Sequence, residues 1–155
     1  MKAAQELYEG IEIDGMGAVG LITYMRTDSL RISAEAMTEA AQFIEQTYGK
    51  EYLPPSARVF KSKKNSQDAH ECIRPTMVSL TPEKVKKDLT SDQFKLYKLV
   101  WERFMACQMA NALLDAVSAK ILVGEYTFTA SGFTVKFDGF TKPYQVAKED
   151  QNEEE

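Results

Sequence analysis

Two helices are predicted in the first third of the chain from the spacing of its apolar residues. Ser33 is a good N-cap, and apolar side chains then recur every three or four residues up to Tyr48, where Gly49 follows. Residues 2–9 show a shorter helical pattern that ends at Gly10. That pattern begins at the first residue without a cap, so we expect the chain to be cut from a longer one.

A second helical region is predicted beyond residue 80. Residues 81–83, Thr-Pro-Glu, place proline at the first position of a helix. Thr90 and Gln93 then fit a capping box, and the helix that follows is expected to run to about Met109. Its aromatic stripe has regular helical spacing, so we expect these residues in the core: Phe94, Tyr97, Trp101 and Phe104.

The segments between the helices lack a helical period. Residues 14–20 hold three glycines and are predicted to form a loop. Residues 21–25 are rich in β-formers and are predicted to be a short buried strand or extended segment. After the proline pair at residues 54–55, residues 56–68 are polar and basic and are predicted to be an exposed loop.

Beyond residue 115 the period changes to two. Three runs of alternating apolar and polar residues are separated by Gly124 and by Ser131-Gly132, which is typical of an antiparallel β-meander. Three strands cannot bury both faces of a sheet, so we expect this part to belong to a larger β domain. The predicted fold class is therefore α+β.

The composition is that of a folded domain. The chain has 155 residues, of which 44% are hydrophobic, too many for a disordered chain. It has no apolar run of the roughly 18 residues needed for a transmembrane helix, and its N-terminus lacks the apolar core of a signal peptide. Cys72 and Cys107 are too few for a disulfide framework, so we interpret them as packing residues in an intracellular, reducing compartment.

The net charge of −4 argues at first against a nucleic-acid partner, but the charge is unevenly spread. Residues 58–103 hold 11 basic and 6 acidic groups, whereas residues 148–155 hold 1 basic and 5 acidic groups. Such asymmetry is more informative than the total. One segment is therefore able to face a polyanion.

Tyr24 and Arg26, at the end of the predicted strand, are the first candidates for chemistry. In an extended chain residues two apart point the same way, so the phenol and the guanidinium would share one face. A nearby cation favours the phenolate form of tyrosine, which is a known type of covalent nucleophile, and arginine binds phosphate bidentately. The alternative, from residue types alone, is a half-buried tyrosine beside a solvated arginine.

A second cluster surrounds His70, the only histidine of the sequence. Asp68, Glu71 and Arg74 bring acids and a cation within seven residues, so His70 is able to donate a hydrogen bond to a phosphate or to transfer a proton. The alternative is a surface helix start with a satisfied histidine. A metal site is not expected, because one histidine and one or two carboxylates make a weak ligand set.

The polar loop carries four cations within seven residues and no acid among them: Arg58, Lys61, Lys63 and Lys64. Cations on such a loop are typical contacts to the phosphate backbone of nucleic acid, which position the partner without reading its sequence. A solvated loop without a partner is the alternative.

Two motifs together resemble the type IA DNA topoisomerases. Residues 20–29, GLITYMRTDS, are similar to the active-site tyrosine motif of that family, and residues 65–76, NSQDAHECIRPT, to its following histidine motif. Their order, their spacing and the helix between them also match the family, whose bacterial members are the most similar. Residues 96–109 and 137–144 continue the likeness, which covers nearly the whole chain. Cys72 stands where the motif has a small alanine, a change that we do not expect to affect the chemistry.

The resemblance implies roles for particular residues. Tyr24 would attack a phosphodiester of one DNA strand, become linked to its 5′ phosphate and release the 3′ hydroxyl. Another strand would pass through the gap before the ester is reversed, and negative supercoils would be relaxed. Arg26 would hold and polarise the scissile phosphate, and His70 would contact the DNA nearby. Supporting DNA contacts would come from Arg74, Lys63 and Lys64.

The resemblance also implies how the chain is organised. Residues 1–110 would form a mostly helical, tyrosine-bearing gate domain (domain III-like), residues 111–147 the first strands of the adjoining arch domain (domain II-like), and residues 148–155 a disordered acidic tail. The family's TOPRIM domain and its acidic Mg²⁺ cluster have no counterpart in this sequence. No metal or cofactor is therefore expected in the chain, Mg²⁺ is expected in the full-length enzyme, and the fragment alone is expected to be inactive.

The implied partners are single-stranded or negatively supercoiled DNA and the remaining domains of the enzyme, in the bacterial cytoplasm at the nucleoid and without a membrane. Two other functions remain open. One is a non-catalytic DNA-binding or interaction module that retains the gate fold, which the absence of an upstream TOPRIM-type acidic segment in the gene would favour. The other is a stand-alone phosphodiesterase that uses Tyr24, against which the missing metal ligands argue.

Overall fold

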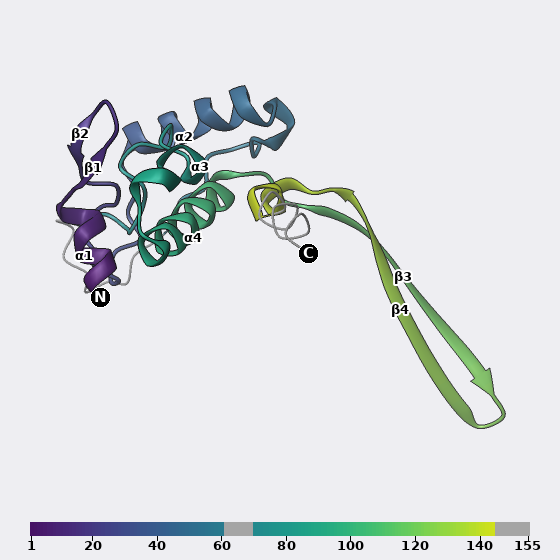
Figure 1. The fold of residues 1–155 in the computed structure, drawn as a ribbon. Helices are drawn as coiled ribbons and strands as arrows, with labels where there is room; N and C mark the ends of the chain where they lie inside the picture. The colour runs from purple at the N-terminus through teal and green to yellow at the C-terminus, as the bar shows by residue number, and fades with distance from the viewer. Residues whose placement is uncertain (61–69, 145–155) are drawn as a thin grey trace.

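The computed structural model of the chain describes residues 1–60 and 70–144, and it confirms the α+β class. Helices and short 3₁₀ turns form a rounded body, and a long two-stranded hairpin projects from it (Figure 1). The helical body contains both motifs singled out in the sequence, as far as they are described.

The N-terminal part is a helix followed by a small hairpin. Helix α1 (Lys2–Glu9) ends at Gly10, whose φ of 134° suits glycine. Strands β1 (Ile11–Ile13) and β2 (Gly17–Val19) then pair antiparallel. The loop predicted over residues 14–20 is therefore wrong in part, because strand formation here depends on pairing with residues 11–13 rather than on local propensity.

Helix α2 (Ala34–Thr47) confirms the prediction made from its N-cap. The Ser33 hydroxyl accepts a hydrogen bond of 3.3 Å from the Ala36 amide, and the helix ends before Tyr48. Ala40 and Ile44 on its inner face are fully buried. A 3₁₀ turn, η1 (Lys50–Tyr52), follows.

The second helical region begins with two short turns. Helix α3 (Pro82–Val85) has proline at its first position, as predicted, and continues into the 3₁₀ turn η2 (Lys86–Asp88). Helix α4 (Ser91–Gln108) begins with the expected capping box, in which Thr90 and Gln93 each bond the backbone amide of the other.

Helix α4 is the centre of the core, with α1, α2 and α3 packed against it. Of its predicted aromatic stripe, Tyr97, Trp101 and Phe104 are buried, whereas Phe94 is only partly buried. The Tyr97 hydroxyl donates to the Leu80 carbonyl at 2.6 Å, and the Trp101 ring nitrogen donates to the Val78 carbonyl at 3.1 Å. These two bonds satisfy the polar ends of buried rings and hold the segment before α3 against the core.

The hairpin consists of β3 (Leu113–Val123) and β4 (Tyr126–Phe137), joined by a two-residue turn at Gly124, whose φ is 61°. The three-stranded meander is wrong in this respect: Ser131 and Gly132 lie inside β4, where they pair with Ser118 and Val117, instead of forming a second turn. Small turn-type residues are tolerated here because both faces of the hairpin are exposed.

The base of the hairpin is joined to the body through Tyr52. Its hydroxyl donates to the Asp138 carboxylate at 2.7 Å, its carbonyl accepts from the Ala110 amide at 2.7 Å, and its ring lies 4.8 Å from that of Phe137. The 3₁₀ turn η3 (Gly139–Thr141) closes the junction. The expected domain division at residue 110 falls in this junction and stays a prediction, and the expected tail at residues 148–155 lies outside the described residues.

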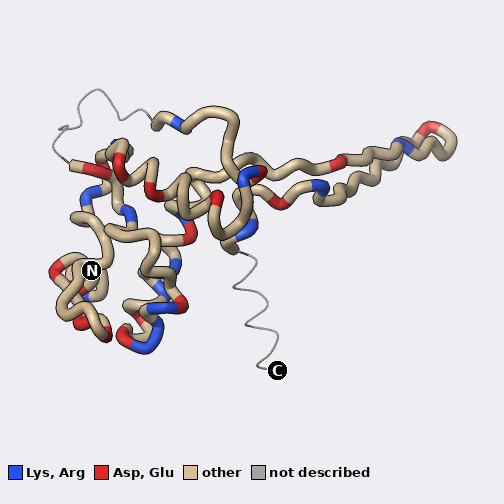
Figure 2. The backbone as a smooth tube through the Cα atoms, turned by 90° about the horizontal axis from the view of Figure 1, so that it is seen from above, with Lys and Arg blue, Asp and Glu red and all other residues tan. Residues whose placement is uncertain are grey.

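Charge is distributed differently over the two parts. Lys, Arg, Asp and Glu are interspersed over the body, whereas they are sparse along the hairpin (Figure 2). The hairpin residues 113–137 include two acids and two bases, Asp115, Glu125, Lys120 and Lys136. The hairpin is thus electrically neutral as a whole and largely apolar.

Candidate active site

The two motifs lie side by side although 35 residues separate them in the sequence. Amides and carbonyls connect them in an antiparallel arrangement: Thr23 donates to the Arg74 carbonyl at 3.0 Å, and Thr76 donates to the Leu21 carbonyl at 3.0 Å. Ile22 and Pro75 form an isolated β-bridge between them. The prediction of a buried extended segment is confirmed for Leu21 and Ile22, which are 0% and 2% exposed.

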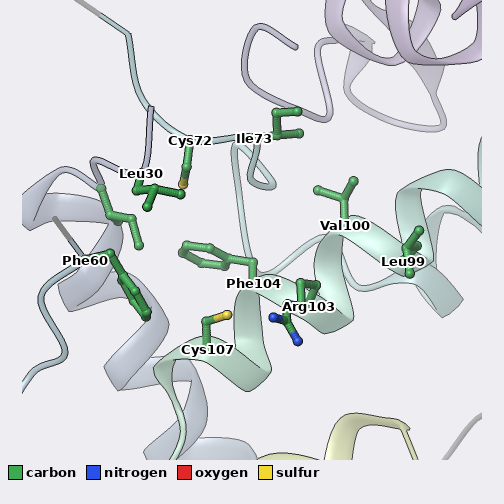
Figure 3. Close-up of a pocket in the computed structure, with 10 residues that line it drawn as sticks. Leu30, Phe60, Cys72, Ile73, Leu99, Val100, Arg103, Phe104 and Cys107 are labelled. Atoms are coloured by element: carbon green, nitrogen blue, oxygen red, sulfur yellow. The ribbon is translucent and has the colours of Figure 1, made fainter. Parts of the chain in front are cut away.

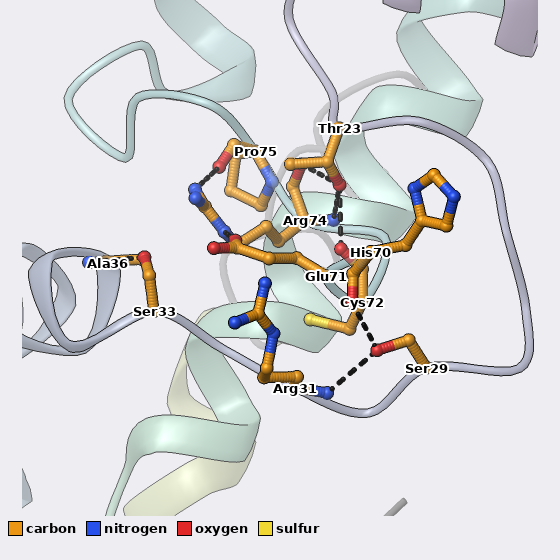
Figure 4. Close-up of polar contacts among 10 residues, drawn as sticks. All are labelled: Thr23, Ser29, Arg31, Ser33, Ala36, His70, Glu71, Cys72, Arg74 and Pro75. Atoms are coloured by element: carbon orange, nitrogen blue, oxygen red, sulfur yellow. Dashed lines mark hydrogen bonds and ion pairs between the residues drawn. The ribbon is translucent and has the colours of Figure 1, made fainter. Parts of the chain in front are cut away.

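Thr23 fixes the backbone immediately before Tyr24. Its hydroxyl donates to the Cys72 carbonyl at 2.7 Å and accepts from the Arg74 amide at 3.0 Å (Figure 4). The side chain of Thr23 therefore satisfies two backbone groups of the opposite segment. This places Tyr24 at the point where a rigid segment ends.

The Tyr24 phenol stands at the surface between two other rings. Tyr24 is 49% exposed. The Tyr8 ring lies 5.3 Å away in an edge-to-face arrangement with an interplanar angle of 66°, and the His70 ring lies 5.7 Å away at 39°. A nucleophile needs access to its substrate, and this phenol is accessible while its ring is flanked on two sides.

Arg26 follows a tight turn rather than an extended stretch. Its amide donates to the Tyr24 carbonyl at 2.8 Å, which makes a three-residue turn centred on Met25. The expectation that the chain stays extended from Tyr24 to Arg26 is therefore wrong. The Arg26 Nε atom binds both carboxylate oxygens of Asp28, at 2.9 and 3.0 Å.

This ion pair leaves the outer end of the guanidinium available. Within the described part of the chain, the Nη atoms of Arg26 make no hydrogen bond, and the side chain is 37% exposed. Asp28 thus orients the guanidinium through Nε, and the two Nη groups are able to bind an anion bidentately.

His70 is held by its backbone and presents its ring outward. The Ser29 hydroxyl donates to the His70 carbonyl at 2.6 Å and also accepts from the Arg31 amide at 3.3 Å. Figure 4 shows the imidazole turned away from the ion pair of Glu71 and Arg74. His70 is therefore positioned beside Tyr24 with a ring that remains accessible from outside.

Arg74 occupies a different environment from Arg26. Its Nε atom lies 2.7 Å from a Glu71 oxygen, its Nη1 atom donates to the Pro75 carbonyl at 3.0 Å, and the two side chains of the ion pair are 14% and 21% exposed. The guanidinium is thus mostly buried and braces its own segment. A DNA contact by Arg74 stays a prediction.

The cations of the polar loop are described only in part. Arg58 donates a hydrogen bond to the Asn111 side chain at the base of the hairpin. Lys61, Lys63 and Lys64 lie outside the described residues, so their predicted DNA contacts remain predictions.

A mostly apolar cavity of about 530 Å³ lies behind the two motifs (Figure 3). Cys72 comes from the histidine motif, Leu30 directly follows the tyrosine motif, and Phe104 and Cys107 come from α4. Burial is the main cause that raises the pKa of the Cys72 thiol above its ordinary value. This agrees with the interpretation of Cys72 as a packing residue, because a raised pKa disfavours the reactive thiolate.

Sequence reasoning missed two members of the site. Ser29 is 5% exposed and joins the tyrosine segment to His70, and its place inside the tyrosine motif was the available signal. Tyr8 touches Tyr24 only because the β1–β2 hairpin returns the chain to the end of α1. No local pattern in the sequence marks that contact.

Metal-binding clusters and membrane-spanning helices are both missing from the part of the chain that the structure describes. Residues 1–60 and 70–144 contain no group of three or more His, Cys, Asp or Glu side chains arranged to hold a metal ion. None of the helices described is both long and apolar enough to cross a membrane.

Comparisons of sequence and of structure both match this chain to DNA topoisomerases. A model of the family described as DNA topoisomerase matches residues 1–155. DNA topoisomerase 1 of Rickettsia conorii is 48% identical over 158 residues, covering 100% of this chain and 20% of that protein. Full-length topoisomerase I from Thermotoga maritima matches in structure with a TM-score of 0.78 and 40% identity, over 93% of this chain and 22% of that one. The chain thus spans about a fifth of the length of these relatives.

Proposed function

Because the chain belongs to the type IA DNA topoisomerase family, we propose that it supplies the nucleophile with which a full-length enzyme cuts and rejoins one strand of DNA. The observation that carries the proposal is the half-exposed Tyr24 phenol, at the end of a braced segment and beside His70.

The proposed step is a transesterification at phosphorus. The Tyr24 oxygen, having lost its proton, attacks the phosphorus of a phosphodiester and forms a new phosphorus–oxygen bond. The bond from phosphorus to the 3′ oxygen breaks, and that oxygen takes up a proton and leaves as a hydroxyl. In the reverse step the 3′ hydroxyl attacks the phosphotyrosine and releases Tyr24. No bond energy is lost between the two steps, so strand passage needs no external energy source.

The neighbouring side chains support this step in different ways. Arg26, oriented by Asp28, offers its Nη groups to the non-bridging oxygens of the phosphate, where negative charge grows in the transition state. His70, whose ring lies 5.7 Å from that of Tyr24, contacts the DNA close to the phosphate. For Arg74, the ion pair with Glu71 favours a role in bracing the His70 segment over direct contact.

The described residues do not fit a magnesium site, since no three or more of their His, Cys, Asp or Glu side chains are grouped so as to hold a metal ion. We propose that the Mg²⁺, which the resemblance implies for the full-length enzyme, binds to other parts of that enzyme than residues 1–60 and 70–144. The same parts and single-stranded or negatively supercoiled DNA are the proposed partners, and the bacterial cytoplasm at the nucleoid is the proposed location.

The test is a covalent adduct in the full-length enzyme that we propose contains this chain. Wild-type protein incubated with single-stranded DNA and Mg²⁺ and then denatured should carry DNA on Tyr24, and Tyr24→Phe should abolish the adduct. Tyr126→Phe is the matched control, because Tyr126 is 73% exposed on the hairpin and lies away from the site. An adduct that persists in Tyr24→Phe would contradict the assignment, and DNA binding by the wild type without any adduct would favour a non-catalytic module.

A relaxation assay with supercoiled DNA tests the 155-residue chain alone. We expect no relaxation of supercoiled DNA in the presence of Mg²⁺, because most of the proposed enzyme is absent. Robust relaxation by the pure chain would overturn the assignment of Mg²⁺ and strand passage to other parts.

A further inference from the structure

The hydroxyl group of Tyr24 contributes little to fixing the orientation of its side chain. Among the residues that the structure describes, none forms a hydrogen bond with its hydroxyl, and the backbone turns sharply just after it. The direction of the phenol therefore depends on the rings beside it. One of these, His70, is on the segment that faces the DNA in the proposed function, whereas the other, Tyr8, is on α1.

The Tyr8 ring meets Tyr24 in a favourable geometry. Its centroid lies 5.3 Å from that of Tyr24 at an interplanar angle of 66°, within the range preferred by edge-to-face aromatic pairs. Such a contact restricts rotation of the Tyr24 ring about its side-chain torsions, because the edge of one ring fits the face of the other. The Tyr8 hydroxyl is not needed for it.

The backbone brings Tyr8 to this place independently of its side chain. The Leu21 amide donates to the Leu7 carbonyl at 2.7 Å, next to Tyr8 in α1. At Gly20 the two segments are so close that a Cβ atom would lie 2.6 Å from the Tyr8 carbonyl oxygen. The end of α1 is thus fixed against the tyrosine segment by main-chain contacts and by a glycine.

The Tyr8 side chain is also not part of the core. It is 41% exposed, whereas the adjacent Leu7 is fully buried and makes the hydrophobic contact of α1. A change of the Tyr8 ring should therefore leave the fold intact and affect what the ring touches.

We infer that Tyr8 is a positioning residue for the nucleophile: its ring holds the Tyr24 phenol in the orientation from which it attacks the phosphodiester. The inference rests on the proposed function for its effect on catalysis. Its structural part, that Tyr8 sets the orientation of the Tyr24 ring, holds whether or not the chain is catalytic.

The experiment uses the full-length enzyme with three variants. Tyr8→Leu removes the aromatic ring, Tyr8→Phe keeps the ring and removes only the hydroxyl, and Tyr126→Leu makes the same change as the first on the exposed hairpin. We expect Tyr8→Leu to lower the rate of DNA cleavage at saturating DNA by about two- to tenfold, as the loss of one aromatic pair would. DNA affinity should not change, and Tyr8→Phe and Tyr126→Leu should both cleave at the wild-type rate.

The second readout needs no activity. Fluorotyrosine placed at position 24 alone should give a ¹⁹F resonance in the DNA-free enzyme that moves in Tyr8→Leu and keeps its position in Tyr8→Phe and Tyr126→Leu. An unmoved resonance in Tyr8→Leu, or a loss confined to DNA affinity, would overturn the inference. Absence of a Tyr24 adduct in the wild type would instead overturn the proposed function, and the resonance would still report on Tyr8.

Discussion

Tyr52 is a phenol whose ionisation is governed by one carboxylate. Its hydrogen bond to Asp138 is the largest cause that raises the pKa of Tyr52 to about 12, followed by burial. For Asp138 burial acts to raise the pKa, but the hydrogen bonds from Tyr52 and Lys142 outweigh it, so the pKa is lowered from its ordinary value. The pair therefore favours a neutral phenol and a charged carboxylate, the state in which the hydrogen bond at the hairpin base is intact.

The sign of the pH dependence follows from these directions. A phenol whose pKa is raised on folding stabilises the protein fully below its unfolded pKa, about 10, and this contribution is lost as the pH rises through the folded value of about 12. Between pH 10 and 12 the wild type should lose more stability to denaturant than Tyr52→Phe does. Absorbance of phenolate should show one tyrosine fewer titrating near pH 12 in that variant.

Asp138→Asn provides the complementary measurement. It should return the pKa of Tyr52 toward 10, because the carboxylate that raises it is gone. An unchanged titration in Asp138→Asn would mean that burial rather than the hydrogen bond controls Tyr52.

For single residues, the sequence allowed predictions where the candidate residues lie within short motifs. Tyr24, Arg26 and His70 are candidates on which motif and resemblance agree; their roles stay predictions, and the structure brings Tyr24 and His70 together. The sequence could not predict which of the two arginines has its guanidinium fully engaged within the protein. Arg74 pairs with Glu71 three residues earlier, whereas Arg26 keeps two nitrogens available after binding Asp28. That difference depends on burial, which two distant segments create jointly.

Among the elements, the junction between α4 and the hairpin depends on one glycine. Gly139 has a φ of 50°, and a Cβ atom there would lie 2.6 Å from backbone atoms of Asn111. The close approach allows the Phe140 amide to reach the Ala110 carbonyl at 2.9 Å. The direction in which the hairpin leaves the body therefore depends on the absence of a side chain at this position.

We predict that Gly139→Ala destabilises the chain by about 1–3 kcal/mol, the typical cost of a strained backbone conformation, with the close contact adding to it. Gly132→Ala is the matched control, because a Cβ atom added there would have no neighbouring atom within 4 Å and the φ of Gly132 is not positive. Denaturant unfolding of both variants checks the difference. Equal stability of the two would show that the junction repacks around the added methyl group.

Helices were predicted more reliably than strands, and the reason is physical. Ser33, Thr90 and Gln93 mark helix starts through hydrogen bonds to groups within three residues, so the signal and the structure are equally local. Strands pair with partners that the local sequence does not specify. The segment at Ser131-Gly132 reads as a turn, yet it is paired along β4 because the register is set by the turn at Gly124.

The molecule as a whole combines a body with a buried core and a hairpin whose side chains are almost all exposed. The body has a core built around α4, where Tyr97 and Met105 are fully buried. In the hairpin every side chain of β3 is exposed, including large apolar ones such as Leu122 at 75%. The hairpin therefore depends mainly on its ladder of hydrogen bonds, and a lone two-stranded hairpin is marginally stable in water.

Amide hydrogen exchange of the 155-residue chain should therefore divide into two classes. Amides in the centre of α4, around Tyr97 and Met105, should exchange only through global unfolding, because the core must open to expose them. Amides of β3 and β4 near the turn at Gly124 should exchange many times faster, through local opening that breaks no side-chain packing. Protection of the hairpin equal to that of α4 would contradict this. A repeat at lower protein concentration would then separate intrinsic stability, which is independent of concentration, from association of exposed hairpins, which is not.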